Sequence, residues 1–174
     1  MTEDPHITLG PLNVWVRDRP YADASDDRDA SWLDIRAEVR VPGAVVSCEG
    51  PYLRTVELED FLNQLDAANR ALSGSALLET LEPNLKVEVV FRALGHAELK
   101  IDITPDHLSQ NHRFWDGTDQ TYIQEAIRQI RTVLSEYPVL GRPPGKTGKP
   151  SASKLAGIGS ALADAVFGKK VDPT

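Results

Sequence analysis

Apolar and polar residues alternate with a period of two over several stretches of the chain, as in strands with one buried face. The clearest case is Trp32–Val41, where positions 33, 35, 37, 39 and 41 are apolar and charged residues fill most positions between them. His107–Trp115 is less regular, and its pattern allows a short edge strand. The other predicted strands are Ile7–Val16, Ala44–Val56, Ala76–Glu82, Leu85–Ala93 and His96–Ile103, with turns at Pro42-Gly43, Pro83-Asn84 and Leu94-Gly95.

Two other segments repeat apolar residues at helical spacing. The first follows the candidate cap Thr55 and stops near Gly74, and the second follows the candidate caps Asp119 or Thr121 and ends at Pro138. The first stripe is Leu58, Phe61, Leu62, Leu65, Ala68 and Leu72, and the second is Ile123, Ala126, Ile127, Ile130, Val133, Leu134 and Tyr137.

A single helix separates the two groups of strands, so repeated β-α-β units are not indicated. We therefore expect an α+β fold, with a single antiparallel twisted sheet covered on one face by two main helices. Residues 1–140 form this domain, and residues 141–174 form a flexible C-terminal extension. In the extension, residues 141–152 are rich in Gly, Pro and Lys and predict a linker, while Ser153–Lys170 predicts a marginal helix.

The acidic residues are concentrated in the predicted domain. Residues 1–140 hold 24 acidic and 13 basic residues, whereas the extension is basic, and the whole chain has a net charge of -7. Such a domain repels nucleic acid phosphates and attracts basic protein surfaces. Solubility alone is an equally good reason for the charge. One cysteine, the lack of a signal peptide pattern and the lack of any stretch of about 20 apolar residues predict a cytoplasmic protein.

Candidate catalytic and metal-binding patterns are weak. Gly145-Lys146-Thr147 resembles a phosphate-binding loop, but Gly141 is one position too close to it. His107 and His112 lack the further clustered ligands of a zinc site. Cys48 has no nucleophile motif around it and fits a small buried residue. We therefore expect no enzyme, no metal and no cofactor.

Candidate binding residues are loop residues, because loops carry recognition more often than packed strands. An acidic loop runs from Arg17 to Ser31, and Trp115-Asp116 lies in a segment without a strong periodic pattern. Trp15 and Trp32 are weaker anchor candidates than Trp115, and the competing surface is the polar side of the predicted hairpin. The predicted contact residues are Asp23, Asp26, Asp27, Asp29, Trp115 and Asp116, and the competing surface bears Lys86, Glu88, Glu98, Lys100 and Asp102.

Three segments in serial order resemble the WapI-type immunity protein family over residues 5–140. They are LSGSALLETLEPNLKVEV (Leu72–Val89), GHAELKI (Gly95–Ile101) and a helix that opens with DQTYI and ends in YPVLG (Asp119–Gly141). The resemblance implies a small α+β domain that neutralises a secreted toxin by stoichiometric occlusion. The member that gives the family its name blocks a toxin that cleaves tRNA. The long acidic loop, HLSQNHRFWDG before DQTYI and the tail after Gly141 depart from the pattern.

Taken together, these features predict a non-catalytic protein that binds another protein, with a basic nuclease toxin domain as the candidate partner. A stand-alone scaffold or regulatory interaction module is the alternative, and a small hydrolase or metal-dependent enzyme is a weaker one.

Overall fold

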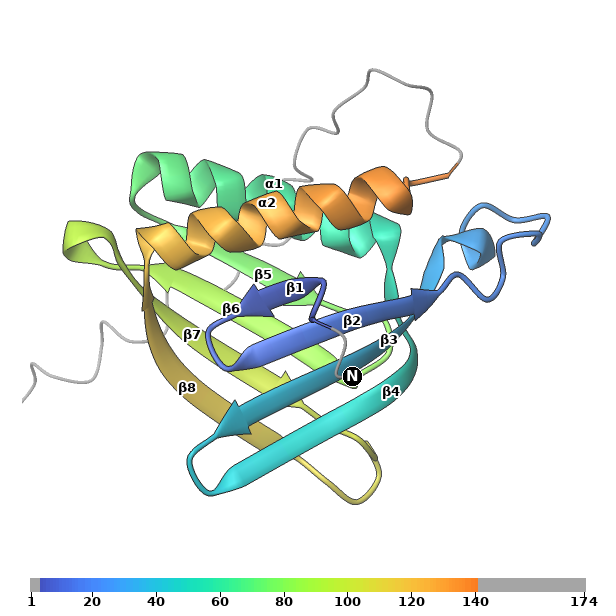
Figure 1. Ribbon diagram of the computed structural model, residues 1–174, viewed down its shortest axis with the longest axis horizontal. Helices are drawn as coiled ribbons and strands as arrows, with labels where there is room; N and C mark the ends of the chain where they lie inside the picture. Colours follow the sequence, from blue (N-terminus) through green and yellow to red (C-terminus); the bar gives the residue numbers. More distant parts are fainter. Residues whose placement is uncertain (1–3, 141–174) are drawn as a thin grey trace, which may run out of the picture.

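The computed structural model of the chain describes residues 4–140 and contains two four-stranded antiparallel sheets and two helices (Figure 1). The α+β class is confirmed, but the expected single sheet is wrong. Sheet A has the order β1 (Ile7–Leu9), β2 (Leu12–Asp18), β3 (Trp32–Val41), β4 (Ala44–Arg54). Sheet B has the order β5 (Ser75–Glu79), β6 (Leu85–Phe91), β7 (His96–Ile103), β8 (His112–Asp119). The expected linker, the tail helix and Gly145-Lys146-Thr147 lie outside the described residues.

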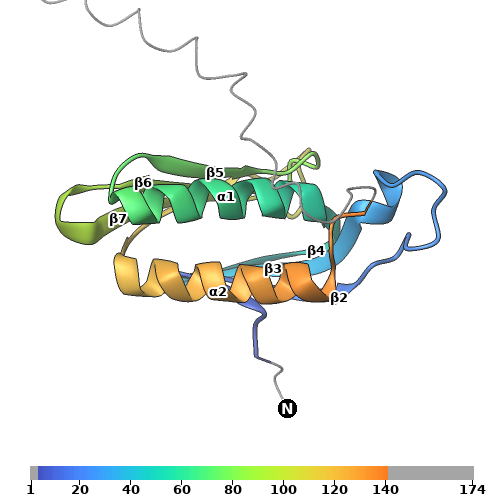
Figure 2. The ribbon, with the colours of Figure 1, turned by 90° about the horizontal axis from the view of Figure 1, so that it is seen from above.

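Helix α1 (Thr55–Ala71) carries the chain from sheet A to sheet B, and α2 (Gln120–Glu136) follows β8. Seen from above, the helices lie side by side along one open side of the two facing sheets, α1 next to sheet B and α2 next to sheet A (Figure 2). Asp66 of α1 pairs with Arg131 of α2 at 3.1 Å. No helix among residues 4–140 is long and apolar enough to span a membrane.

The two-sheet arrangement follows from the amount of apolar surface on the strands. Eight strands spaced about 4.8 Å apart form a sheet nearly 40 Å wide, whereas two helices, each about 10 Å across, cover about half of it. Two sheets that face each other bury both apolar faces, and the helices then close one side. The core accordingly contains residues from both sheets and both helices, among them Leu33, Ile35, Leu65, Val87, Ile101 and Ile123, all fully buried.

Local turns change the bounds of two predicted strands, and the strands predicted to end at Val56 and Ala93 each end two residues earlier, at Arg54 and Phe91. Ile7–Val16 is divided into β1 and β2 by Gly10-Pro11. Gly10 has φ +56°, and a Cβ there would lie 2.5 Å from Cδ1 of Leu99 in sheet B, so only glycine fits this close approach. Ala76–Glu82 is shortened to β5.

The start of α1 also differs from the prediction. Thr55 is the first helical residue and not the cap, and its buried hydroxyl has no hydrogen-bond partner. The Glu57 carboxylate accepts from the Arg54 backbone N–H at 2.9 Å instead, as in a capping box. Leu72 does not extend the buried stripe, because it closes the helix with φ 51° and is exposed.

The second helix begins as predicted with Asp119 as its cap, and the Asp119 Oδ1 accepts from the Thr121 N–H at 2.8 Å. The irregular segment before it forms the eight-residue edge strand β8, longer than the predicted short strand and shifted toward the helix. Trp115 therefore lies in a strand and not in a loop.

Glutamine side chains of the helices cover one edge of each sheet. Gln129 of α2 accepts from the Thr8 N–H of β1 at 2.8 Å. Gln64 of α1 accepts from the Leu77 N–H of β5 at 3.1 Å and donates to the Leu77 carbonyl at 3.5 Å. These amides take the place of a neighbouring strand, so β1 and β5 are not open to another chain.

Candidate partner-binding surfaces

Cys48, His6 and His112 each contact a neighbouring group of the fold. Cys48 is buried, and burial raises the pKa of its thiol to about 11, so it is protonated at neutral pH. The His6 Nδ1 accepts from the Val16 N–H at 3.0 Å, and His112 contacts Gln110 at 3.3 Å. Residues 4–140 contain no group of His, Cys, Asp and Glu side chains placed to hold a metal ion.

The acidic loop projects from one end of the molecule between β2 and β3 (Figure 1). Asp23, Asp26, Asp27 and Asp29 are all exposed. Asp26 caps a short internal turn by accepting from the Arg28 N–H at 2.8 Å, and a 3-10 turn at Asp29–Ser31 returns the chain to β3. The four carboxylates therefore face solvent on a loop with internal hydrogen bonds.

Arg19 fastens the base of this loop to the end of α2. Its Nη2 donates to the Pro138 carbonyl at 2.7 Å, and its guanidinium lies 5.9 Å from the centre of the Tyr137 ring. Burial lowers the pKa of Arg19. Since Arg19 is held at the base, the projecting part of the loop carries four aspartates against Arg28.

Trp115 is an exposed side chain on the outer face of sheet B. It pairs in register with Lys100 of β7, exposes 70% of its surface, and has the Arg113 guanidinium 6.0 Å from its ring centre. Trp15 and Trp32 are only half-buried, and they lie against Arg36 at 5.0 Å and Arg54 at 5.5 Å. Trp115 thus offers more free apolar surface than the other two tryptophans.

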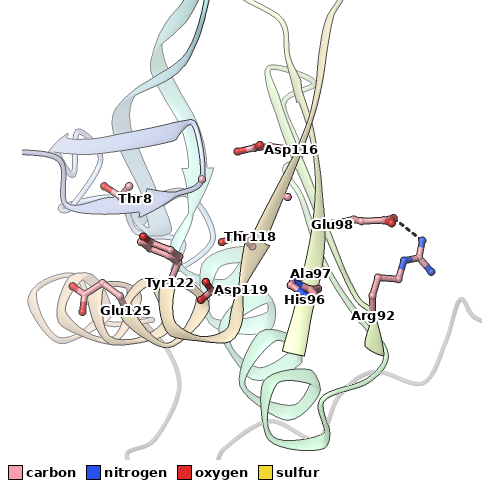
Figure 3. Close-up of a pocket in the computed structure, with 12 residues that line it drawn as sticks. Thr8, Arg92, His96, Ala97, Glu98, Asp116, Thr118, Asp119, Tyr122 and Glu125 are labelled. Carbon is pink, nitrogen blue, oxygen red and sulfur yellow. Dashed lines mark hydrogen bonds and ion pairs between the residues drawn. The ribbon is translucent and has the colours of Figure 1, made fainter. Parts of the chain in front are cut away.

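Trp115 and Asp116 do not share a surface, although they are neighbours in sequence. Successive side chains of a strand point to opposite faces. Asp116 pairs in register with Leu99, whose side chain is buried between the sheets, and it points toward the β1–β2 turn (Figure 3). Trp115 instead joins the competing surface, because Lys100, its partner in register, belongs to that face.

Charges on the competing surface are largely paired with one another. Asp102 binds Arg113 at 2.6 Å, Glu98 binds Arg92 at 2.6 Å, and Glu88 lies 4.0 Å from Lys100. Lys86 binds Glu79 at 2.7 Å. Such a face presents little net charge to a partner, so its exposed tryptophan is the feature that distinguishes it.

A depression of about 800 Å³ lies where β8 passes into α2, beside the β1–β2 turn (Figure 3). Its lining holds four carboxylates and one arginine, together with His96 and Tyr122. The carboxylates are Glu98, Asp116, Asp119 and Glu125, and the arginine is Arg92. We call this site the acidic depression.

The carboxylates of the acidic depression are not equivalent. Glu98 is paired with Arg92 and points away from the β1–β2 turn, Glu125 is paired with Arg128, and Asp119 caps α2 (Figure 3). Asp116 has no hydrogen-bond or ion-pair partner among residues 4–140. Asp116 is therefore the carboxylate most available to a cationic group.

The acidic loop and the acidic depression lie at opposite ends of α2. The loop base contacts Pro138, just after the helix, whereas the depression contains Asp119 at its start. A 17-residue helix is about 25 Å long. The acidic loop is therefore separated from Asp116 by the length of the helix, and one partner touches both only by spanning it.

Two exposed apolar residues were not selected from the sequence: Tyr122 lines the acidic depression, and Leu94 lies outside its lining. Tyr122 is 65% exposed on the first turn of α2, and Leu94 is 94% exposed at the tip of the β6–β7 hairpin with φ 63°. The sequence contained a signal for each residue. Tyr122 lies outside the buried stripe of the second helix, and Leu94 stands in a turn where glycine is usual.

Comparison with known proteins identifies one family. The model of the immunity protein WapI-like family matches residues 6–138. No curated protein matches the chain. Among solved structures, a chain of the CdiA-CT/CdiI toxin and immunity complex from Enterobacter cloacae is similar at 9% identity, covering 70% of this chain and 99% of that one, with a TM-score of 0.41. A likeness at that level carries no argument about this chain.

Proposed function

The chain belongs to the immunity protein WapI-like family, and from this membership we propose that it neutralises a cognate toxin domain by binding to it. The family match is the observation that carries the proposal. It spans both sheets and both helices of the described structure. The binding is stoichiometric and needs no catalysis by this chain.

The chemistry of the surface supports a basic partner. The exposed loop and the acidic depression both present carboxylates, and the chain as a whole has a net charge of -7. Toxins that cleave nucleic acids bind phosphates and tend to be basic. A complementary negative surface steers such a toxin into the encounter and occupies the groups that would otherwise contact its substrate. We place this encounter in the cytoplasm, where the nucleic acids that such toxins cleave are found.

We expect a neighbouring gene to encode a secreted protein with a C-terminal toxin domain, and co-expression with that domain tests this function. We expect growth to be restored and a 1:1 complex to be recovered by size-exclusion chromatography with light scattering. A nuclease toxin of unrelated sequence serves as the specificity control and should remain lethal. Continued toxicity of the neighbouring domain, without a complex, would contradict the proposal, and so would a neighbourhood of biosynthetic genes.

A further inference from the structure

Of the four sheet edges in residues 4–140, β8 is the one that is continuous and uncovered. The edges of β1 and β5 are covered by Gln129 and Gln64. β4 pairs with β3 without a break only from Ala44 to Gly50, because the register shifts beyond Gly50 and the next residue, Pro51, has no N–H. β8 pairs with β7 without a break from His112 to Asp119, contains no proline, and is exposed over most of its length.

We propose that β8 receives an extended, lysine- or arginine-bearing segment of the partner protein, which adds a fifth strand to sheet B. The inference rests on the proposed function only for the identity of that partner. Backbone hydrogen bonds along an open edge bind any extended chain, and the side chains on either side select which chain is accepted.

The side chains beside β8 differ on its two faces, and this difference selects the segment. Alternate residues of an added strand would lie beside Trp115 on the outer face and beside Asp116 and Thr118 on the other. The outer side offers a 70% exposed tryptophan ring. The other side opens on the acidic depression, where Asp116 lacks a partner among the described residues and the charge of Arg92 is already matched by Glu98. Apolar residues on one side and basic residues on the other therefore fit this edge.

A second copy of this chain fits the edge less well. Pairing of β8 with β8 of another molecule would bring two acidic depressions together, each with the Asp116 carboxylate that has no partner among the described residues. Like charges brought close together repel each other, and no basic cluster lines the depression to offset this repulsion. Charge complementarity thus favours a basic segment of a different protein.

The probe is a blocked eight-residue peptide of alternating lysine and valine, with the alternating glutamate and valine peptide as its negative control. Fluorescence anisotropy should show binding of the lysine peptide alone to the full chain. Hydrogen exchange followed by mass spectrometry should show slower exchange in β8 and unchanged exchange in β4. Slowed exchange elsewhere, equal binding of the two peptides, or no binding at millimolar concentration would overturn the proposal.

Asp116→Lys places a cation where the proposal needs an anion, and Asp27→Lys in the acidic loop makes the same change of net charge at the other end of α2. Asp116→Lys should weaken peptide binding about tenfold, because the variant loses an attraction to the peptide lysines and gains a repulsion from them. Asp27→Lys should change it less than twofold. Asp116→Asn, with the same melting temperature as the wild type, should give an intermediate loss and separates charge from folding defects. Equal effects of the two lysine variants would show general electrostatics and refute a β8 site.

The two proposals can fail separately. Protection against the toxin that persists in Asp116→Lys and Trp115→Ala would leave the immunity function standing and remove β8 as its site. Binding of the lysine peptide at β8 without protection against any neighbouring toxin would retain the docking edge and reject the immunity function.

Discussion

At the scale of single residues, Trp115 is a large apolar side chain that the fold does not use. It is 70% exposed and contacts Arg113 at the ring. Trp115→Ala should therefore leave the melting temperature nearly unchanged while speeding dissociation from the toxin domain. The loss should be about 2 kcal/mol or more if the ring is buried in the complex.

Surface plasmon resonance measures the dissociation rate, and circular dichroism confirms that the variant is folded. Tyr21→Ala, which removes an exposed aromatic ring from the acidic loop, is the matched control. Unfolding of Trp115→Ala, or a dissociation rate equal to that of the wild type, would argue against Trp115 as an anchor.

Glu38 is a residue whose charge the fold does use. It lies on the outer face of sheet A yet is only 4% exposed, because Arg36 and Arg40 cover it at 2.6 and 2.8 Å. Burial alone would raise the pKa of Glu38, but hydrogen bonds from Arg36 and Arg40 outweigh it and lower the pKa below the ordinary 4.5. A lowered pKa stabilises the fold above pH 4.5, and that contribution is lost as the pH falls through the folded-state pKa.

We expect Glu38→Gln to lower the free energy of unfolding at neutral pH by about 1–2 kcal/mol, since hydrogen bonds to charged groups are lost while the arginines stay partly solvated. The difference from the wild type should shrink as the pH falls from 4.5 through the lower folded-state pKa of Glu38, because below that pKa Glu38 is protonated in both the folded and unfolded wild type. Urea unfolding of both proteins over this pH range measures the difference in free energy of unfolding. Glu98→Gln, which breaks the fully exposed pair with Arg92, should show little change, and a constant difference at all pH values would contradict the charge argument.

At the scale of elements, the helices protect sheet edges as well as covering the core. Gln129→Ala and Gln64→Ala should each destabilise the fold by about 1 kcal/mol and speed amide exchange at Thr8 and Leu77. The double variant should also self-associate, because it opens two further edges to pairing. Gln124→Ala, on the exposed face of α2, is the control and should do neither.

Native-state hydrogen exchange and light scattering provide the measurements. Unchanged exchange at Leu77 in Gln64→Ala would mean that water satisfies this edge equally well.

At the scale of the whole molecule, the two acidic regions lie about 25 Å apart along α2 and should have different roles. The acidic loop projects into solvent, so its charges act on the approach of a basic partner. Converting Asp23, Asp26, Asp27 and Asp29 to asparagine should slow association severalfold and flatten its dependence on salt, with little effect on dissociation. Stopped-flow mixing with the toxin domain at several ionic strengths measures both effects.

A variant with the same net charge separates the loop from the total charge of the chain. Its four neutralised positions are exposed carboxylates elsewhere, namely Asp4, Asp60, Glu82 and Glu136. Equal slowing in the two quadruple variants would show that net charge, and not the loop, steers the encounter.

Local patterns were sufficient where one residue's environment follows from its neighbours in sequence. The alternation over Trp32–Val41 and His96–Ile103 matches β3 and β7 at both ends, and Asp119, one of two candidate caps, is the cap of α2. The family resemblance rested on the serial order of such segments, and the match over residues 6–138 confirms it. These features are encoded locally, because strand alternation and helix capping depend on residues within a few positions of each other.

Tertiary structure decided how the strands divide into sheets and which surfaces come together. Alternation shows that one face of a strand is buried but not which element buries it. The pattern of β4 and β5 is therefore the same whether the two strands lie in one sheet or in two. β8 was predicted poorly because Phe114 is its one apolar residue on the inner face, so apolar and polar residues do not alternate along it. The opposite orientations of Trp115 and Asp116, the burial of Glu38 by arginines and the acidic depression between β8, α2 and the β1–β2 turn all depend on contacts between residues far apart in the chain. Their energies are set by burial and distance in the folded state, which the order of residues along the chain does not specify.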